Sequence, residues 1–174
     1  MESLKIVAFS VAAAICYGIL HDQVTAQVCV EYFTVAHPPV FPTQSPFWLA
    51  IGWGVIATWW VGLPLGALLA AAARIGDNPK LCAAELRRPI VLLMACCGLL
   101  AMLTGLIGAA LVSASVVPVP GGWAEAIPPE RHVAFSFAAW AHTASYLPGA
   151  VGGLFLVGRT AWLRGRSARQ SAAA

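Results

Sequence analysis

Histidine and carboxylate side chains recur in this otherwise apolar chain, and together they could bind a metal ion or relay protons. The candidate ligands are His21, Asp22, Glu31, His132 and His142. Histidine supplies a neutral nitrogen ligand or a proton relay near neutral pH. A mixed set of imidazole and carboxylate groups suits zinc or iron better than copper(I), which prefers sulfur ligands. Three such ligands and one open position would form a metal site of the catalytic type.

The spacing of these residues matches no standard metal motif. The chain contains no H-E-x-x-H sequence, and its apolar runs contain no E-x-x-H pair. His142 is the strongest individual candidate because an ionisable residue inside a membrane span is rare and usually faces the protein interior. The alternative for His142 is a neutral ring that hydrogen-bonds to a tyrosine or a backbone carbonyl.

The other candidates also have structural alternatives. Asp22 could cap a helix that begins at Gln23. Glu31 could lie in interfacial water, and Glu130 could form a local ion pair with Arg131 at a helix N-terminus. The sequence alone does not decide between these roles and ligand binding.

The composition is that of a membrane protein. The 174 residues are 60% hydrophobic and 10% charged, with a mean hydropathy of +0.80. Soluble domains have roughly 45–50% apolar and 25% charged residues. Four apolar runs approach or exceed the roughly 20 residues that a spanning helix needs: residues 4–20, 47–73, 90–117 and 133–157. No small-x-small cleavage site follows the first run, so we expect it to be retained as a span.

These runs predict an all-α fold, an integral membrane four-helix bundle. We expect one domain over residues 1–163 and a flexible cytoplasmic tail over residues 164–174. Of the ten Lys and Arg residues, only Arg131 lies in the first or third connection. Because cytoplasmic flanks carry an excess of Lys and Arg, both termini should be cytoplasmic, in the inner membrane of a bacterium. The net charge of +3 fits contact with the lipid bilayer. The sequence has no basic stretch interleaved with aromatic residues, the pattern that would indicate nucleic-acid binding.

The first connection, residues 21–46, is long for a link between helices and lacks Lys and Arg. We expect a helix that continues the first span or lies at the membrane interface, with a strand over residues 28–35 as the alternative. Exposing side chains such as Tyr32 and Phe33 would forgo burial. The connection should therefore fold back over the outer mouth of the bundle.

That folding predicts contacts between distant candidates. We expect Asp22 or Glu31 to lie within reach of His142 or His132, directly or through one water molecule. A buried carboxylate without a partner would be costly.

The second run carries Trp59 and Trp60 near the predicted middle of the bilayer, too deep for the interfacial aromatic belt. These rings could form a flat wall for a cofactor such as a quinone or haem. The alternative is that they pack helix against helix.

Two pairs of small residues would let helices approach closely: Gly62 with Gly66, and Gly149 with Gly153. These glycine-rich faces support a different class of function, in which the protein is an accessory subunit of a larger membrane complex or a homo-oligomer. The same chemistry would also serve packing within one chain.

Residues 17–38 read YGILHDQVTAQVCVEYFTVAHP. This stretch resembles the signature of a family of small bacterial four-span membrane proteins, which carry an H/N-D-Q-x-T…E-Y-F-T block after the first span. The resemblance implies no particular activity. Because the block admits Asn at the position of His21, that residue would be less essential than its neighbours. The resemblance implies that seven residues matter together: Asp22, Gln23, Thr25, Glu31, Tyr32, Phe33 and Thr34.

The sequence thus predicts an extracytoplasmic polar site that binds a metal ion or relays protons. A divalent metal such as zinc or iron is favoured over haem. The alternatives are an accessory or structural subunit, and an enzyme or transporter for a lipid or small apolar molecule near Trp59 and Trp60. No phosphate-binding loop, dinucleotide fingerprint, nucleophile elbow or redox dithiol is present, so the sequence assigns no reaction.

Overall fold

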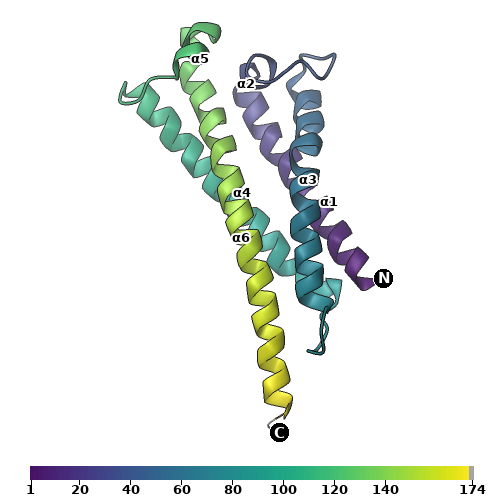
Figure 1. Ribbon diagram of the computed structural model, residues 1–174. Helices are drawn as coiled ribbons and strands as arrows, with labels where there is room; N and C mark the ends of the chain where they lie inside the picture. The colour runs from purple at the N-terminus through teal and green to yellow at the C-terminus, as the bar shows by residue number, and fades with distance from the viewer. Residues whose placement is uncertain (173–174) are drawn as a thin grey trace.

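The computed structural model describes residues 1–172, with side chains described through residue 170. Four long helices make up most of the molecule (Figure 1): α1 (Glu2–Val28), α3 (Pro46–Arg74), α4 (Ala83–Ser113) and α6 (His132–Ala172). Shorter helices lie in the connections: α2 (Glu31–Thr34), α5 (Gly121–Ala126) and the 3-10 helix η1 (Pro129–Arg131). The predicted all-α class is confirmed. The strand alternative for residues 28–35 is wrong, because this segment holds the end of α1 and all of α2.

Three helices, α1, α3 and α4, are long and apolar enough to cross a membrane. The chain is therefore a helical protein of membrane character. The fourth predicted run lies within α6, whose apolar stretch is interrupted by His142, Tyr146 and Pro148. A fourth span stays a prediction.

The helices pack as two main pairs, α1 with α3 and α4 with α6 (Figure 1). Glycines bring the first pair into backbone contact. A Cβ atom added to Gly54 would lie 2.5 Å from the backbone nitrogen of Ile19, and one added to Gly18 would lie 2.5 Å from the carbonyl oxygen of Gly54. Only glycine permits this approach, and it occurs within one turn of His21.

Of the four glycines in the two predicted small-residue pairs, three contact a neighbouring helix and one has open space around it. Added Cβ atoms at Gly62 and Gly66 would press on Ser10 of α1 and its neighbours, and one at Gly153 would press on Leu65 of α3. These three glycines thus serve packing within the chain. Gly149 has nothing within 4 Å of an added Cβ. An association with a larger complex stays a prediction.

Arg164 joins α6 to the end of α3. Its buried guanidinium donates hydrogen bonds to the backbone carbonyls of Ala72, Ile75, Asn78 and Pro79. Backbone carbonyls at the end of a helix lack intrahelical partners and carry partial negative charge. They can therefore stabilise the positive charge of Arg164 without a carboxylate. The structure continues α6 as a helix as far as Ala172, through most of the stretch that was predicted to be a tail; residues 173–174 lie outside the described residues.

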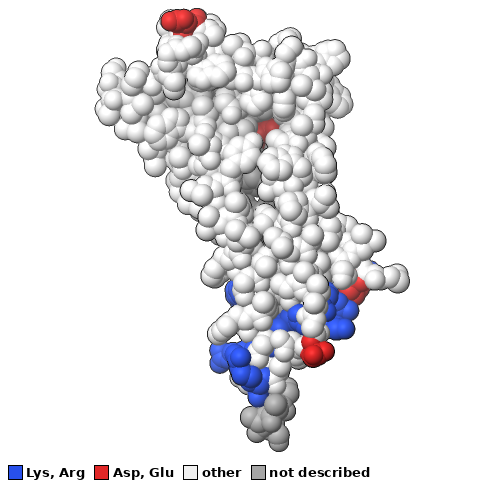
Figure 2. All heavy atoms as spheres, viewed as in Figure 1, with Lys and Arg blue, Asp and Glu red and all other residues white. Residues whose placement is uncertain are grey.

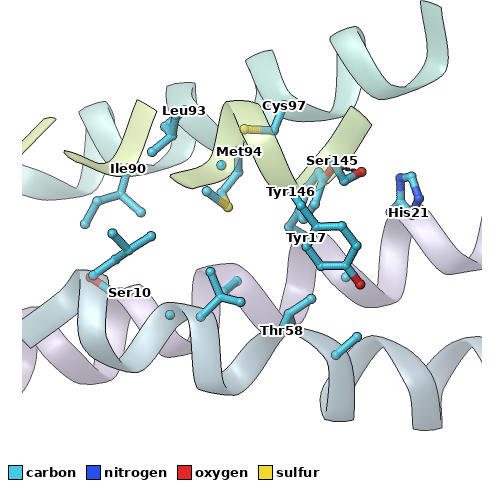
Figure 3. Close-up of a pocket in the computed structure, with 18 of the residues that line it drawn as sticks. Ser10, Tyr17, His21, Thr58, Ile90, Leu93, Met94, Cys97, Ser145 and Tyr146 are labelled. Atoms are coloured by element: carbon cyan, nitrogen blue, oxygen red, sulfur yellow. Dashed lines mark hydrogen bonds between the residues drawn. The ribbon is translucent and has the colours of Figure 1, made fainter. Parts of the chain in front are cut away.

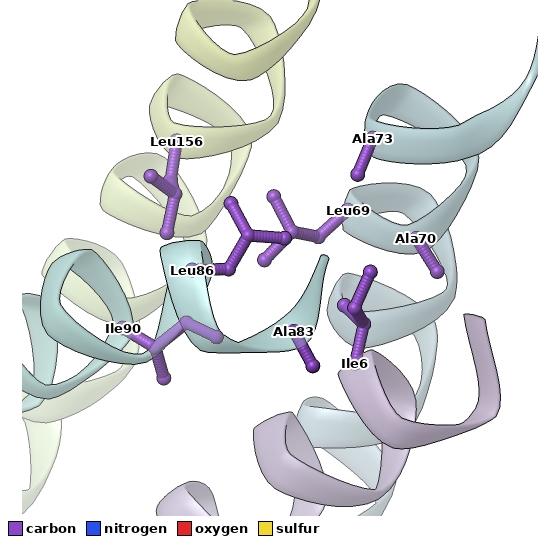
Figure 4. Packing of buried hydrophobic residues seen from close by; sticks show 8 residues of the cluster. All are labelled: Ile6, Leu69, Ala70, Ala73, Ala83, Leu86, Ile90 and Leu156. Carbon is purple, nitrogen blue, oxygen red and sulfur yellow. The ribbon is translucent and has the colours of Figure 1, made fainter. Parts of the chain in front are cut away.

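A cluster of buried aliphatic side chains joins all four long helices at the end of the bundle near the N-terminus (Figure 4). It comprises Ile6, Leu69, Ala70, Ala73, Ala83, Leu86, Ile90 and Leu156. Lipid tails are as apolar as leucine, so in a bilayer this cluster stabilises the bundle through close packing. Lys and Arg side chains gather at the same end, whereas the opposite half is almost free of them on the face that Figure 2 shows.

Candidate metal centre

Helix α1 continues beyond its apolar run and carries His21 and Asp22 into the bundle interior. His21 is 6% exposed and Asp22 is 4% exposed. Because α1 ends at Val28, Asp22 does not cap a helix that begins at Gln23, and the capping alternative is wrong. The buried hydroxyl of Thr25 donates a hydrogen bond to the backbone carbonyl of His21 at 3.2 Å and so has its partner within the helix.

His142 of α6 meets Asp22 in the interior. The Nε2 atom of His142 lies 3.0 Å from Oδ1 of Asp22, and both side chains are buried. The ligand atoms of His21, Asp22 and His142 all lie within 4.8 Å of one another. The expectation that a carboxylate of the first connection reaches His142 is confirmed for Asp22.

The hydrogen bonds of His142 require a proton or a metal ion between its Nε2 and the carboxyl group of Asp22. Its Nδ1 donates to the carbonyl oxygen of Ala138 at 2.9 Å, since a carbonyl can only accept. In a neutral ring, Nε2 then presents a lone pair to the carboxylate of Asp22, which is also an acceptor. Two acceptors 3.0 Å apart need a positive species between them. A proton or a metal ion meets that need.

His21 has buried nitrogens without partners. Neither Nδ1 nor Nε2 of His21 forms a hydrogen bond, and both atoms are inaccessible to solvent. The His21 ring stands edge-on to that of His142, with centroids 4.6 Å apart. Buried polar atoms in proteins nearly always have a partner, and an exception indicates an ion, a water molecule or a functional role. The unpartnered ring of His21 lies beside two further potential metal ligands, Asp22 and His142.

Aromatic side chains of the first connection cover the site at the end of the bundle that holds α2. The ring centroids of Tyr32 and Phe33 lie 4.4 and 5.5 Å from that of His142. His37 hydrogen-bonds through Nδ1 to the carbonyl of Tyr32 and packs on Trp53. Burial lowers the pKa of His37 and raises that of Tyr32, so both stay uncharged at neutral pH. The connection thus folds back over the bundle mouth, as predicted.

Glu31 lies outside the metal-ligand group because a cation already binds it. Arg131 donates to Glu31 through Nε at 2.9 Å and through Nη2 at 3.0 Å, and Nη2 also donates to the carbonyl of Val28 at 2.9 Å. Burial raises the pKa of the Cys29 thiol to about 11, and the protonated thiol donates to Glu31 at 3.2 Å. Among the described ion pairs Arg131 bonds to Glu31 rather than to Glu130. The pair fastens the first connection to η1.

His132 also lies outside the group. Its Nε2 bonds to the carbonyl of Ile127 at 2.9 Å, which closes the turn before α6. Trp59 and Trp60, predicted to line a cofactor site, are about half exposed and line neither of the described cavities. They face the surroundings of the bundle rather than the histidine cluster.

A cavity of about 120 Å³ adjoins the cluster between the four long helices. His21, Asp22 and His142 line one end of it, and Figure 2 shows an acidic side chain inside a hollow between α3 and α6. Tyr17 also lines the cavity and bonds to Ser145 at 2.9 Å. Tyr17 was not among the predicted site residues, although its place one helical turn before His21 puts both on one face of α1.

Comparison of the chain with protein-family models, curated proteins and solved structures yields no match. The resemblance over residues 17–38 therefore stays a prediction. The geometry of the site carries the functional argument.

The ion pair of Glu31 and Arg131 predicts a pH-dependent stability. Arg131 holds the pKa of Glu31 below its ordinary value of 4.5, so the pair stabilises the fold above that pH, and the contribution is lost as the pH falls through the lowered pKa. Replacing Glu31 by Gln should cost about 0.5–1 kcal/mol at pH 7, because the pair is partly exposed. Thermal unfolding of both proteins from pH 7 to pH 3 should show the difference shrinking. Glu125→Gln, at an exposed acidic residue, should show no such loss.

Proposed function

We propose that this protein is a four-span protein of a bacterial inner membrane that binds one divalent transition-metal ion through His21, Asp22 and His142. The observation that carries the proposal is the pair of buried, unpartnered nitrogens of His21, which lie beside two acceptors that need a proton or a metal ion between them. Two imidazoles and a carboxylate are the ligand set of many zinc and iron sites.

The surroundings of His142 support a metal ligand. A metal-bound histidine almost always donates its second ring N–H to a carbonyl or carboxylate, which fixes the tautomer. The bond from Nδ1 of His142 to Ala138 supplies that interaction and directs Nε2 at the site. Zinc ligands at about 2.0–2.2 Å from the metal stand roughly 3.3–3.6 Å from one another. Ligand atoms within 4.8 Å of one another therefore need only short side-chain movements. Because all three residues line one end of the cavity, a metal ion bound by them would have its open position toward that cavity.

A proton relay is the second candidate, and the 3.0 Å separation of His142 Nε2 and Asp22 Oδ1 favours it. A shared proton satisfies both atoms at that distance. It leaves His21 unexplained, which is why the metal site is preferred.

The orientation of the bundle is proposed from charge. Lys and Arg side chains gather at the end that holds the N-terminus and the C-terminal part of α6 (Figure 2), and the metal site lies in the opposite half. Cytoplasmic ends carry this excess, so the site would lie toward the periplasm. Reporter fusions after residues 40 and 125 should report the periplasm, and fusions after residues 80 and 170 the cytoplasm. A periplasmic C-terminus would refute the proposed orientation and the placement of the site toward the periplasm.

The metal proposal predicts that replacing His21 by phenylalanine has opposite effects on stability and binding. Phenylalanine keeps the ring contacts with Tyr17 and His142 but removes two unsatisfied nitrogens. The metal-free variant should gain about 1–3 kcal/mol of unfolding free energy. It should also lose the bound metal, as measured by elemental analysis and by titration with cobalt(II), whose absorption reports its ligands.

The matched control is His132→Gln, at a histidine that lies outside the group. It should bind metal as the native protein does. A purely structural His21 would give a different pattern, in which H21F neither changes metal content nor differs from the control. That result would refute the metal site and leave the proton relay of Asp22 and His142.

A further inference from the structure

The cavity beside the metal site is a long slot with one polar end. At 1.5 Å of rise per residue, about 16 Å of helix separates the two lining residues Ser10 and His21 of α1. His21 stands at one end of the slot in Figure 3, and Ile90 stands at the other. At the far end Leu69 and Leu156 of the aliphatic cluster close it.

Most polar groups along the slot already have partners. The hydroxyl of Ser10 donates to the carbonyl of Ile6, and that of Thr58 donates to Gly54. The hydroxyls of Tyr17 and Ser145 bond to each other. Among the described residues, the fully buried side-chain nitrogen and oxygen atoms without a partner belong to His21. A ligand of this slot therefore needs one polar end and an otherwise apolar body.

The charges around the polar end of the slot favour a ligand whose polar group is uncharged. Asp22 lies beside His21, and no Lys or Arg lines the slot. An anionic head would lie against a carboxylate, and burying an unpaired charge is costly. A phospholipid headgroup carries an anionic phosphate and is disfavoured for the same reason. Its opening, visible as the hollow between α3 and α6 in Figure 2, lies among apolar side chains that a bilayer would cover.

We infer that the slot binds a single-chain lipid with a small, uncharged, oxygen-bearing head of the long-chain alcohol class. The head oxygen lies against His21 and the chain runs between the four helices toward Ile90. This inference rests on the proposed site for its polar end. A molecule of this class would contact the open position of the proposed metal site.

Gly149 allows a direct test, because it lines the slot and has open space around an added Cβ. Gly149→Leu should place a side chain in the slot, and its Cβ would meet no neighbouring atom within 4 Å. Gly158→Leu is the matched control, since Gly158 also has open space but does not line the slot. Equal melting temperatures of the two variants establish that both are folded.

The probe is hexadecanol that carries a photoreactive diazirine at its chain end, applied to the full-length protein in lipid nanodiscs without added metal. We expect crosslinks on Ile90, Leu93 or Leu156, and a roughly ten-fold loss of labelling in Gly149→Leu, the scale of an overpacked interior, but none in Gly158→Leu. Hexadecanol should compete and palmitate should not. Labelling that is unchanged in Gly149→Leu, or equal competition by palmitate, would overturn the inference. Metal content, measured separately with H21F, decides the proposed function independently.

Discussion

Replacing Asp22 by alanine should lower the affinity for zinc or cobalt(II) by more than about 100-fold. Loss of a residue that only hydrogen-bonds to a metal ligand already costs about 10–100-fold, and loss of a ligand should cost more. Asp22 supplies the negative charge of the site, and its Oδ1 lies 3.0 Å from Nε2 of His142. Asp22→Asn keeps the size of the side chain but removes the charge, so it should lose most of the same affinity. Competition with a chromophoric chelator measures both variants.

The control for Asp22 is Glu125→Ala, which removes an exposed carboxylate in the connection before α6. Its metal affinity should equal that of the native protein. If Asp22→Ala and Glu125→Ala bound metal equally well, Asp22 would not be a ligand and the site would have to lie elsewhere.

The second large effect concerns the backbone contact of α1 and α3. Gly54→Ala should destabilise the protein by about 3 kcal/mol or more, at the upper end for overpacked interiors. The added Cβ would lie 2.5 Å from the backbone nitrogen of Ile19, and a backbone atom cannot rotate away as a side chain can. Helix α1 must then shift, and His21 and Asp22 shift with it. Unfolding by denaturing detergent and metal titration should both report the damage.

Gly158→Ala is the control, since an added Cβ there meets nothing within 4 Å. It should be neutral or stabilising by up to about 1 kcal/mol, the difference in helix propensity between alanine and glycine. A Gly54→Ala protein as stable as this control would show that α1 and α3 do not approach as closely as described.

The long helices were predictable because apolar runs of spanning length leave few alternatives for the backbone. A helix that continues the first span was one of the two helical forms expected for the start of the first connection, and α1 continues as far as Val28. The continuation of α6 past Arg164 was not expected. The backbone carbonyls that bind Arg164 lie 85 to 92 residues earlier in the chain, and no local pattern announces such partners.

The sequence indicated which residues could form the site, but not which carboxylate would pair with His142. Asp22 and Glu31 were equal candidates to reach His142, because the sequence places both in or next to the same connection. The structure assigns Glu31 to Arg131, 100 residues away, and leaves Asp22 for His142, 120 residues away. Only the three-dimensional arrangement distinguishes the two. Trp59 and Trp60 illustrate the opposite case, where aromatic residues at mid-span face outward.

X-ray absorption spectroscopy of the full-length protein loaded with zinc tests the metal site most directly. We predict two imidazole nitrogens, recognisable by the multiple scattering of their rings, and carboxylate oxygen, all at about 2.0–2.2 Å. The imidazole signal should fall to one ring in H21F if any metal remains bound. Sulfur ligands, or a shell of oxygen atoms without imidazole scattering, would contradict a site built from His21, Asp22 and His142.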